Sequence, residues 1–123
     1  MEIGKKATAQ VTVSEKNTAK AVGSGNLDVF ATPMMIALME AAACNCLTNS
    51  LELGQSSVGT LVNVSHTAAS PIGETITATA TIDKIDGRKV TFTVVAHDSK
   101  NEIGNGTHER FVIDVERFMA KLK

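Results

Sequence analysis

The most apolar stretch of the chain is residues 33–47 (PMMIALMEAAACNCL), in which Glu40 is the only charged residue. The stretch is rich in Ala, Leu and Met and contains no Gly, which favours a helix. Thr32 followed by Pro33 is typical of a helix start, with a capping hydroxyl ahead of a proline in the first turn. Because this helix is apolar on nearly all sides, we expect other structure to wrap around it.

Beyond about residue 55 the pattern changes to a period of two, and Thr and Val become frequent, which is typical of β-strands. Asp86-Gly87 is a strong hairpin signal, and Gly104 and Gly106 suggest a bulge in the last strand. The predicted strands are residues 7–13, 58–67, 74–84, 88–97 and 102–115, followed by a short tail at 116–123.

These elements predict an α+β fold in which a curled, mostly antiparallel five-stranded sheet wraps around one long central helix. This is the hot-dog architecture, and we expect residues 1–123 to form one such domain. A small open sheet leaves an edge strand unpaired, so we expect a homodimer whose sheets join across a two-fold axis. Further assembly to a tetramer stays open.

Composition excludes several classes of partner. The chain has 12 Lys+Arg and 13 Asp+Glu, and the net charge of −1 provides no basic field for a nucleic acid backbone. With four Phe and no Tyr or Trp, it also has few platforms on which bases could stack. We therefore expect no nucleic-acid partner.

The sequence also gives no sign of export or membrane insertion. Residues 1–20 are polar and contain four lysines, unlike a signal peptide, and the apolar stretch is too short to span a bilayer. We expect a cytoplasmic protein without a membrane partner. Cys44 and Cys46 point about 200° apart on a helix, so we expect two buried small hydrophobes rather than a disulfide or a metal site.

Glu40 is the first candidate for chemistry. An unpaired carboxylate is costly to bury, so it must be paired, protonated or placed at a cleft. A desolvated carboxyl with a raised pKa is suited to act as a general base or nucleophile. The alternative is a structural carboxylate held by neighbouring groups.

Thr32 and His66 are further candidates. The start of a helix offers free N–H groups that could hold a carbonyl oxygen, although capping alone would explain Thr32. Glu40 follows about 12 Å along the axis and about 80° around it, so both side chains can line one groove without touching. His66 ends a predicted strand on the face of Val58, Thr60, Val62 and Val64, where a lone histidine is more often structural than catalytic.

The remaining histidines are less informative. His97 lies at a turn and is interpreted as solvated, while His108 stays ambiguous. Three histidines without further cysteines or a nearby acidic cluster indicate no metal site.

At these residues the chain resembles the hot-dog thioesterases related to fluoroacetyl-CoA thioesterase. The likeness runs from about Val29 to the C-terminus, in VFATPMMIALMEAAA, SVGTLVNVSHTAASPIGETITATA and AHDSKNEIGNGTHERFVI. In that family a Thr at the head of the helix, a Glu two turns later and a His on the following strand form the catalytic group. The resemblance implies catalytic roles for Thr32, Glu40 and His66, and substrate-binding roles for Gly59 and Arg110.

The resemblance implies hydrolysis of an acyl-CoA thioester at a cleft shaped by the dimer, with CoA as part of the substrate and no metal or other cofactor. Glu40 would attack the thioester carbonyl or activate water, Thr32 would position the carboxylate and substrate, and His66 would assist proton transfer. Two other functions stay open: a module that binds acyl-CoA without turning it over, and a hot-dog enoyl-CoA hydratase.

Two features of the substrate are left open. The fluoroacetyl enzyme of the family carries a longer, Phe-bearing lid before the helix, whereas residues 19–31 here contain only Phe30, so the acyl group is not determined. Arg88, Lys89 and Arg110 are candidates for contacts with the phosphates of CoA, although solvated strand charges are the favoured interpretation.

Overall fold

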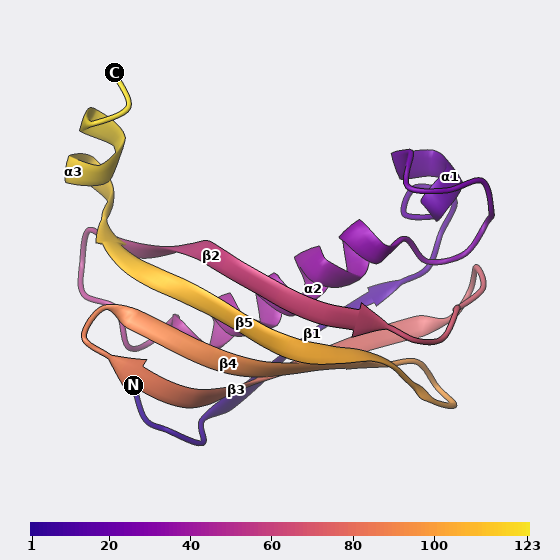
Figure 1. Ribbon diagram of the computed structural model, residues 1–123, viewed down its shortest axis with the longest axis horizontal. Coiled ribbons are helices and arrows are strands. Elements are labelled where there is room, and N and C mark those ends of the chain that lie inside the picture. Colours follow the sequence, from indigo (N-terminus) through magenta and orange to yellow (C-terminus); the bar gives the residue numbers. More distant parts are fainter.

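A curved antiparallel sheet and one long helix make up most of the computed structural model, which describes residues 1–123 (Figure 1). The strands lie in the order β1-β3-β4-β5-β2, so β1 and β2 form the edges. The predicted α+β arrangement is confirmed. In chain order, the elements are β1 (Lys6–Thr12), α1 (Ala19–Val22), α2 (Thr32–Leu47), β2 (Gln55–His66), β3 (Thr75–Asp86), β4 (Lys89–His97), β5 (Glu102–Asp114) and α3 (Val115–Ala120).

The core lies between α2 and the sheet. Alternate residues of the inner strands β3 and β4 point toward the helix, which is why a period of two predicts these strands. Alanines at several of these positions allow the helix to approach the sheet closely. The buried residues of these three elements are Met35, Leu38, Met39, Ala42, Ala43, Cys46 and Leu47 from α2, Ile76, Ala78, Ala80 and Ile82 from β3, and Val90, Phe92, Val94 and Ala96 from β4.

Within the chain, the curved sheet wraps around one side of α2 and leaves the other side uncovered. Ala37, Ala41 and Cys44 are exposed on the other side. Cys44 is therefore not the buried residue that we expected, whereas Cys46 is buried and its Sγ lies 3.2 Å from the carbonyl oxygen of Ala80. A strip of small side chains on α2 is left without a partner within the chain.

The two short helices were not predicted. One turn of helix forms at α1, where the Thr18 hydroxyl accepts a hydrogen bond from the Ala21 N–H, and α3 occupies part of the predicted tail. Helices of one or two turns are too short to show a 3.6-residue period. No helix in the structure has the length and apolar character needed to cross a bilayer.

An irregularity in β2 changes which residues face α2. The hairpin at Asp86 is confirmed, and a register shift opposite Gly104 agrees with the expected bulge. A further bulge, which was not predicted, lies at Thr60. Because an extra residue reverses the alternation, Ser57 and Gly59 share a face with His66, and the prediction that placed Val58 and Thr60 there is wrong.

Candidate active site

Thr32 and His66 meet at one end of α2. The Thr32 Oγ1 lies 2.8 Å from His66 Nδ1, so the first residue of the helix is joined to the last residue of β2. Thr32 is not the N-cap that the sequence predicted: Ala31 holds that position, without a side-chain cap. The hydroxyl is instead engaged by the histidine.

His66 has one ring nitrogen without a partner. Its Nε2 is buried and makes no hydrogen bond, although buried polar atoms are nearly always paired. Burial lowers the pKa of His66, which favours the neutral ring, while a backbone hydrogen bond at Ala68 acts in the opposite direction. A neutral imidazole with a free Nε2 can exchange a proton with a group that binds beside it.

A pocket of about 260 Å³ adjoins this pair. The α1 region and the segment leading into α2 supply one part of its wall, and the end of β2 with the following loop supplies the other. Phe30 is 1% exposed and belongs to the core, whereas Val22 and Leu27, earlier in the chain, are exposed. The lining residues are Ala19, Ser24, Val29, Phe30, Thr32, His66, Thr67, Ala68 and Ala69.

Glu40 belongs to a second cluster, further along α2. Its Oε2 lies 3.0 Å from Nη1 of Arg110. The carboxylate is therefore paired, which is one of the three states expected for it. The side chain of Arg110 is only 8% exposed, whereas that of Glu40 is 39% exposed. A buried guanidinium therefore holds a carboxylate that solvent can still reach.

Arg110 is fixed from its other side by Ser57. The arginine donates from Nε to the Ser57 hydroxyl at 2.8 Å and from Nη2 to the Ser57 carbonyl at 3.1 Å. The interpretation of Arg110 as a solvated strand charge is thus wrong. The same interpretation is correct for Arg88 and Lys89, whose side chains are exposed and form ion pairs with carboxylates.

Gly59 allows the Glu40 carboxylate to lie against the backbone of β2. A Cβ at this position would come within 2.6 Å of Glu40 Oε2 and 3.4 Å of Arg110 Nη1. Any other residue would displace the carboxylate, so the absence of a side chain is part of the site's geometry.

Gly59→Ala is therefore expected to lower kcat by about 100-fold, because a misplacement of about 1 Å at a reacting group has an effect of that size. The measurement is steady-state turnover, with thermal unfolding to establish that the variant folds. Ser56→Ala, an exposed change on the same strand, serves as the control. A Gly59→Ala enzyme with wild-type kcat would contradict this role for the glycine.

The structure brings Thr32 and His66 together but leaves Glu40 with Arg110 and Gly59 in a separate cluster. Two members of that cluster were not predicted: Ser57 was not named from the sequence, and His108 was left ambiguous. A signal for His108 was available: it alternates with Arg110 and Val112, and all three are buried on one face of β5. No three His, Cys, Asp or Glu side chains gather as ligands for a metal.

His66 and His108 predict a pH dependence of stability. Burial is the largest cause that lowers the pKa of both His66 and His108 below the ordinary 6.5. Between the folded pKa and 6.5 the unfolded chain binds more protons, so the free energy of unfolding rises with pH through that window and levels off above it. Urea denaturation from about pH 5 to pH 7.5 tests this, and a stability that increases as the pH falls below 6.5 would contradict it.

Comparison with known proteins agrees with the fold. Residues 13–116 match the family described as fluoroacetyl-CoA-specific thioesterase, FlK. A fluoroacetyl-CoA thioesterase from Streptantibioticus cattleyicolor is 48% identical over 96 residues, which cover 78% of this chain and 69% of that protein.

Solved structures agree as well. A structure of the fluoroacetyl-CoA thioesterase FlK superposes with a TM-score of 0.93 at 40% identity, over 99% of this chain and 95% of that chain. A thioesterase superfamily member from Thermus thermophilus gives a TM-score of 0.91 at 25% identity, over 98% of this chain and 90% of that one. The predicted hot-dog fold and the family resemblance are both confirmed, and the chain belongs to the fluoroacetyl-CoA-specific thioesterase family.

Proposed function

We propose that this protein is an acyl-CoA thioesterase that hydrolyses its substrate to a free acid and CoA. The observation that carries the proposal is the Glu40 carboxylate, which buried Arg110 holds against the open backbone of Gly59. Such a carboxylate is oriented yet accessible, as a nucleophile or general base must be. Membership of the thioesterase family supports the same reaction.

In the proposed reaction, Glu40 either attacks the thioester carbonyl or removes a proton from the attacking water. With attack by Glu40, the C–S bond breaks, CoA leaves as a thiolate, and water then hydrolyses the mixed anhydride to release the acid. A thiolate is a good leaving group near neutral pH. Thr32 and His66 position the acyl group and transfer protons, and no metal or bound cofactor takes part.

The active form is proposed to be a homodimer, because the two clusters lie on different parts of α2. β2 is an edge strand with Leu61 and Val62 exposed, and α2 beside it has an unpartnered strip of small residues. Antiparallel pairing of β2 with a second copy, in a register centred between Val62 and Asn63, would place Gly59 of one subunit near the partner subunit's His66. Glu40 would then complete the site that the partner subunit's Thr32 and His66 begin.

The acyl group is proposed to occupy the pocket beside Thr32 and His66. Its volume of about 260 Å³ corresponds to about nine water-sized groups at roughly 30 Å³ each. Apart from Phe30 and His66, the lining side chains are small, and none is charged. This supports a short aliphatic or small aromatic acyl group, among which fluoroacetyl is one candidate.

A panel of acyl-CoAs assayed by release of free thiol tests the proposal. The panel contains acetyl-, fluoroacetyl-, butyryl-, hexanoyl-, benzoyl- and palmitoyl-CoA, and turnover of at least one short or aromatic member is expected. Tight binding by calorimetry without any thiol release would overturn it in favour of a binding module. Hydration of crotonyl-CoA without thiol release would instead identify a hydratase.

A further inference from the structure

We infer that His108 is a positioning residue for Glu40, acting through the Arg110 guanidinium. The inference rests on the proposed role of Glu40 in turnover. His108 makes no contact with Thr32 or His66; its partners are Phe92, Leu61 and Arg110.

The orientation of the His108 ring is fixed by packing and by one short hydrogen bond. The residue is 1% exposed, and its ring stacks on Phe92 with centroids 6.0 Å apart and planes 25° from parallel. Its Nδ1 lies 2.7 Å from the carbonyl oxygen of Leu61. Because a carbonyl can only accept, Nδ1 must carry the proton, and in the neutral ring Nε2 is left with a free lone pair.

That lone pair is directed to Arg110. The distance from His108 Nε2 to Arg110 Nη1 is 3.2 Å, and an arginine has only donors, so Nε2 accepts. Nη1 carries two hydrogens, of which one serves His108 and the other serves Glu40 at 3.0 Å. With Ser57 accepting from Nε and Nη2, four of the five guanidinium N–H groups have partners. His108 thus fixes the nitrogen that holds the carboxylate.

The same irregularity of β2 serves both Glu40 and His108. Gly59, which makes room for the carboxylate, precedes the bulge, and Leu61, whose carbonyl orients His108, follows it. The bulge residue Thr60 donates its hydroxyl to the Glu109 carbonyl of the neighbouring strand at 3.2 Å. The histidine, the arginine and the glycine therefore form one structural unit.

Only the neutral form of His108 can play this part, because a proton on Nε2 would face the Arg110 N–H. Burial and the charge of Arg110 lower the pKa of His108. The Leu61 hydrogen bond and the carboxylates of Glu40 and Glu109 act in the opposite direction. His108 Nε2 lies 4.0 Å from Glu40 Oε2. In the protonated form, its N–H would therefore compete with Arg110 for the Glu40 carboxylate.

Three substitutions separate positioning from packing. His108→Gln places an amide oxygen near the position of Nε2, so that it can accept from Arg110 without titrating. His108→Asn keeps a donor near Leu61 but does not reach Arg110, and His108→Phe keeps only the stacking. We expect kcat for the best acyl-CoA to fall by about 10- to 100-fold in the Asn and Phe variants with little change in KM, as outer-shell losses do. The Gln variant is expected to recover most of kcat. Because Gln does not titrate, kcat of this variant is also expected to fall less steeply at low pH than kcat of the wild type.

Hydrogen exchange of the Arg110 guanidinium, followed by NMR without substrate, provides a readout independent of turnover. Exchange is expected to be slow in the wild type and His108→Gln and faster in the Asn and Phe variants. Equal exchange in all four proteins, or wild-type kcat in the Asn and Phe variants, would overturn the inference. So would a loss of kcat in all three variants that simply follows their loss of thermal stability. Absence of thioesterase activity in the wild type, with the expected exchange pattern, would overturn the proposed function and leave the His108–Arg110 contact supported.

Discussion

Glu40→Gln is expected to lower kcat for acyl-CoA hydrolysis by about 10²- to 10⁴-fold, the range attributed to a positioned acid or base. The amide is nearly the same size as the carboxylate and its oxygen can still accept from Arg110, so the buried guanidinium keeps a partner. The loss would therefore report on the negative charge of Glu40 and not on the fold. The measurement is thiol release under saturating substrate, with circular dichroism as the check on folding.

Glu52→Gln provides the matched control, since Glu52 is exposed just after α2 and outside both clusters. It is expected to leave kcat unchanged. Full activity of the Glu40→Gln enzyme would eliminate Glu40 as nucleophile or base. If the variant loses activity, single turnover of the wild-type enzyme in H₂¹⁸O, with enzyme in excess, tests for covalent attack. Label in Glu40, found by peptide mass spectrometry, indicates a mixed anhydride that water opens at the Glu40 carbonyl. Label in the product acid alone fits both activation of water and opening of the anhydride at its acyl carbon.

Mixing two inactive variants is expected to restore activity if each site draws on both subunits. One variant carries Thr32→Ala with His66→Ala, and the other carries Glu40→Gln. In a heterodimer, one site would combine intact Thr32 and His66 from one chain with intact Glu40 from the other, while the second site would lack both. Random exchange makes about half of the dimers mixed, so about a quarter of the wild-type activity should return.

The control for this experiment combines two lesions of the same cluster. A mixture of the Glu40→Gln and Gly59→Ala chains leaves every site with a damaged Glu40 cluster, so no activity should return. Light scattering establishes that the subunits form dimers, and native mass spectrometry of the mixture establishes that they have exchanged. If dimers exchange and the first mixture stays inactive, each site is made by a single chain and the proposed arrangement is wrong.

Local sequence patterns predicted most of the fold because each helix or strand pattern continued through most of its element. The apolar run at 33–47 predicts α2 to within one residue at its start, and period-two alternation predicts β3 and β4 because one face of each is buried. The extent of the domain, 1–123, stays a prediction. The one-sided burial of α2 was not predicted, since composition does not show which side of a helix the sheet covers.

The candidate site was predicted less completely. Thr32, Glu40 and His66 were named from their residue types and positions, but their grouping into two clusters was not. The bulge at Thr60 reversed which face half of the β2 residues point to, and Gly59 just before it was not interpreted as a sign of a bulge. Ser57 therefore entered the site unexpectedly, and Arg110 became the buried partner of Glu40.

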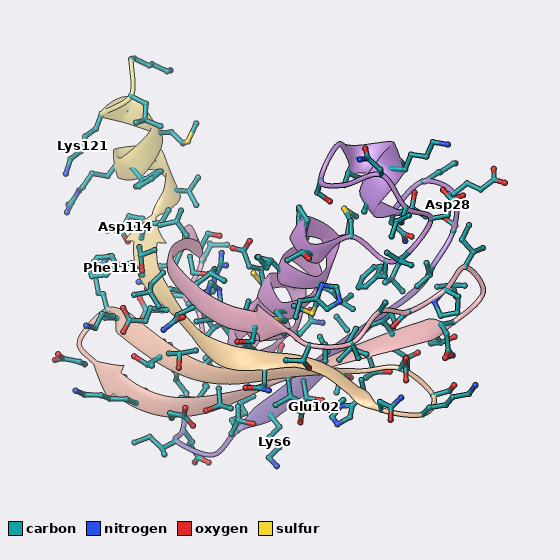
Figure 2. The ribbon with its side chains drawn as sticks, turned by 45° about the vertical axis from the view of Figure 1, so that its right-hand side comes forward. Lys6, Asp28, Glu102, Phe111, Asp114 and Lys121 are labelled. Carbon is teal, nitrogen blue, oxygen red and sulfur yellow. The ribbon has the colours of Figure 1, made fainter.

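The sequence by itself determined the elements, the hairpin at Asp86 and the residue types available for chemistry, because propensity and periodicity act over a few neighbouring residues. Only the tertiary structure decided that Arg110 and His108 lie against Glu40. These residues are about 70 positions from Glu40 in the chain, and the register of β2 with β5 brings them into contact. It also placed α3 and the loop before α2 at opposite ends of the molecule, where Asp114 and Asp28 mark them (Figure 2). Contacts of this kind depend on strand pairing and on a one-residue bulge, which no local pattern specifies.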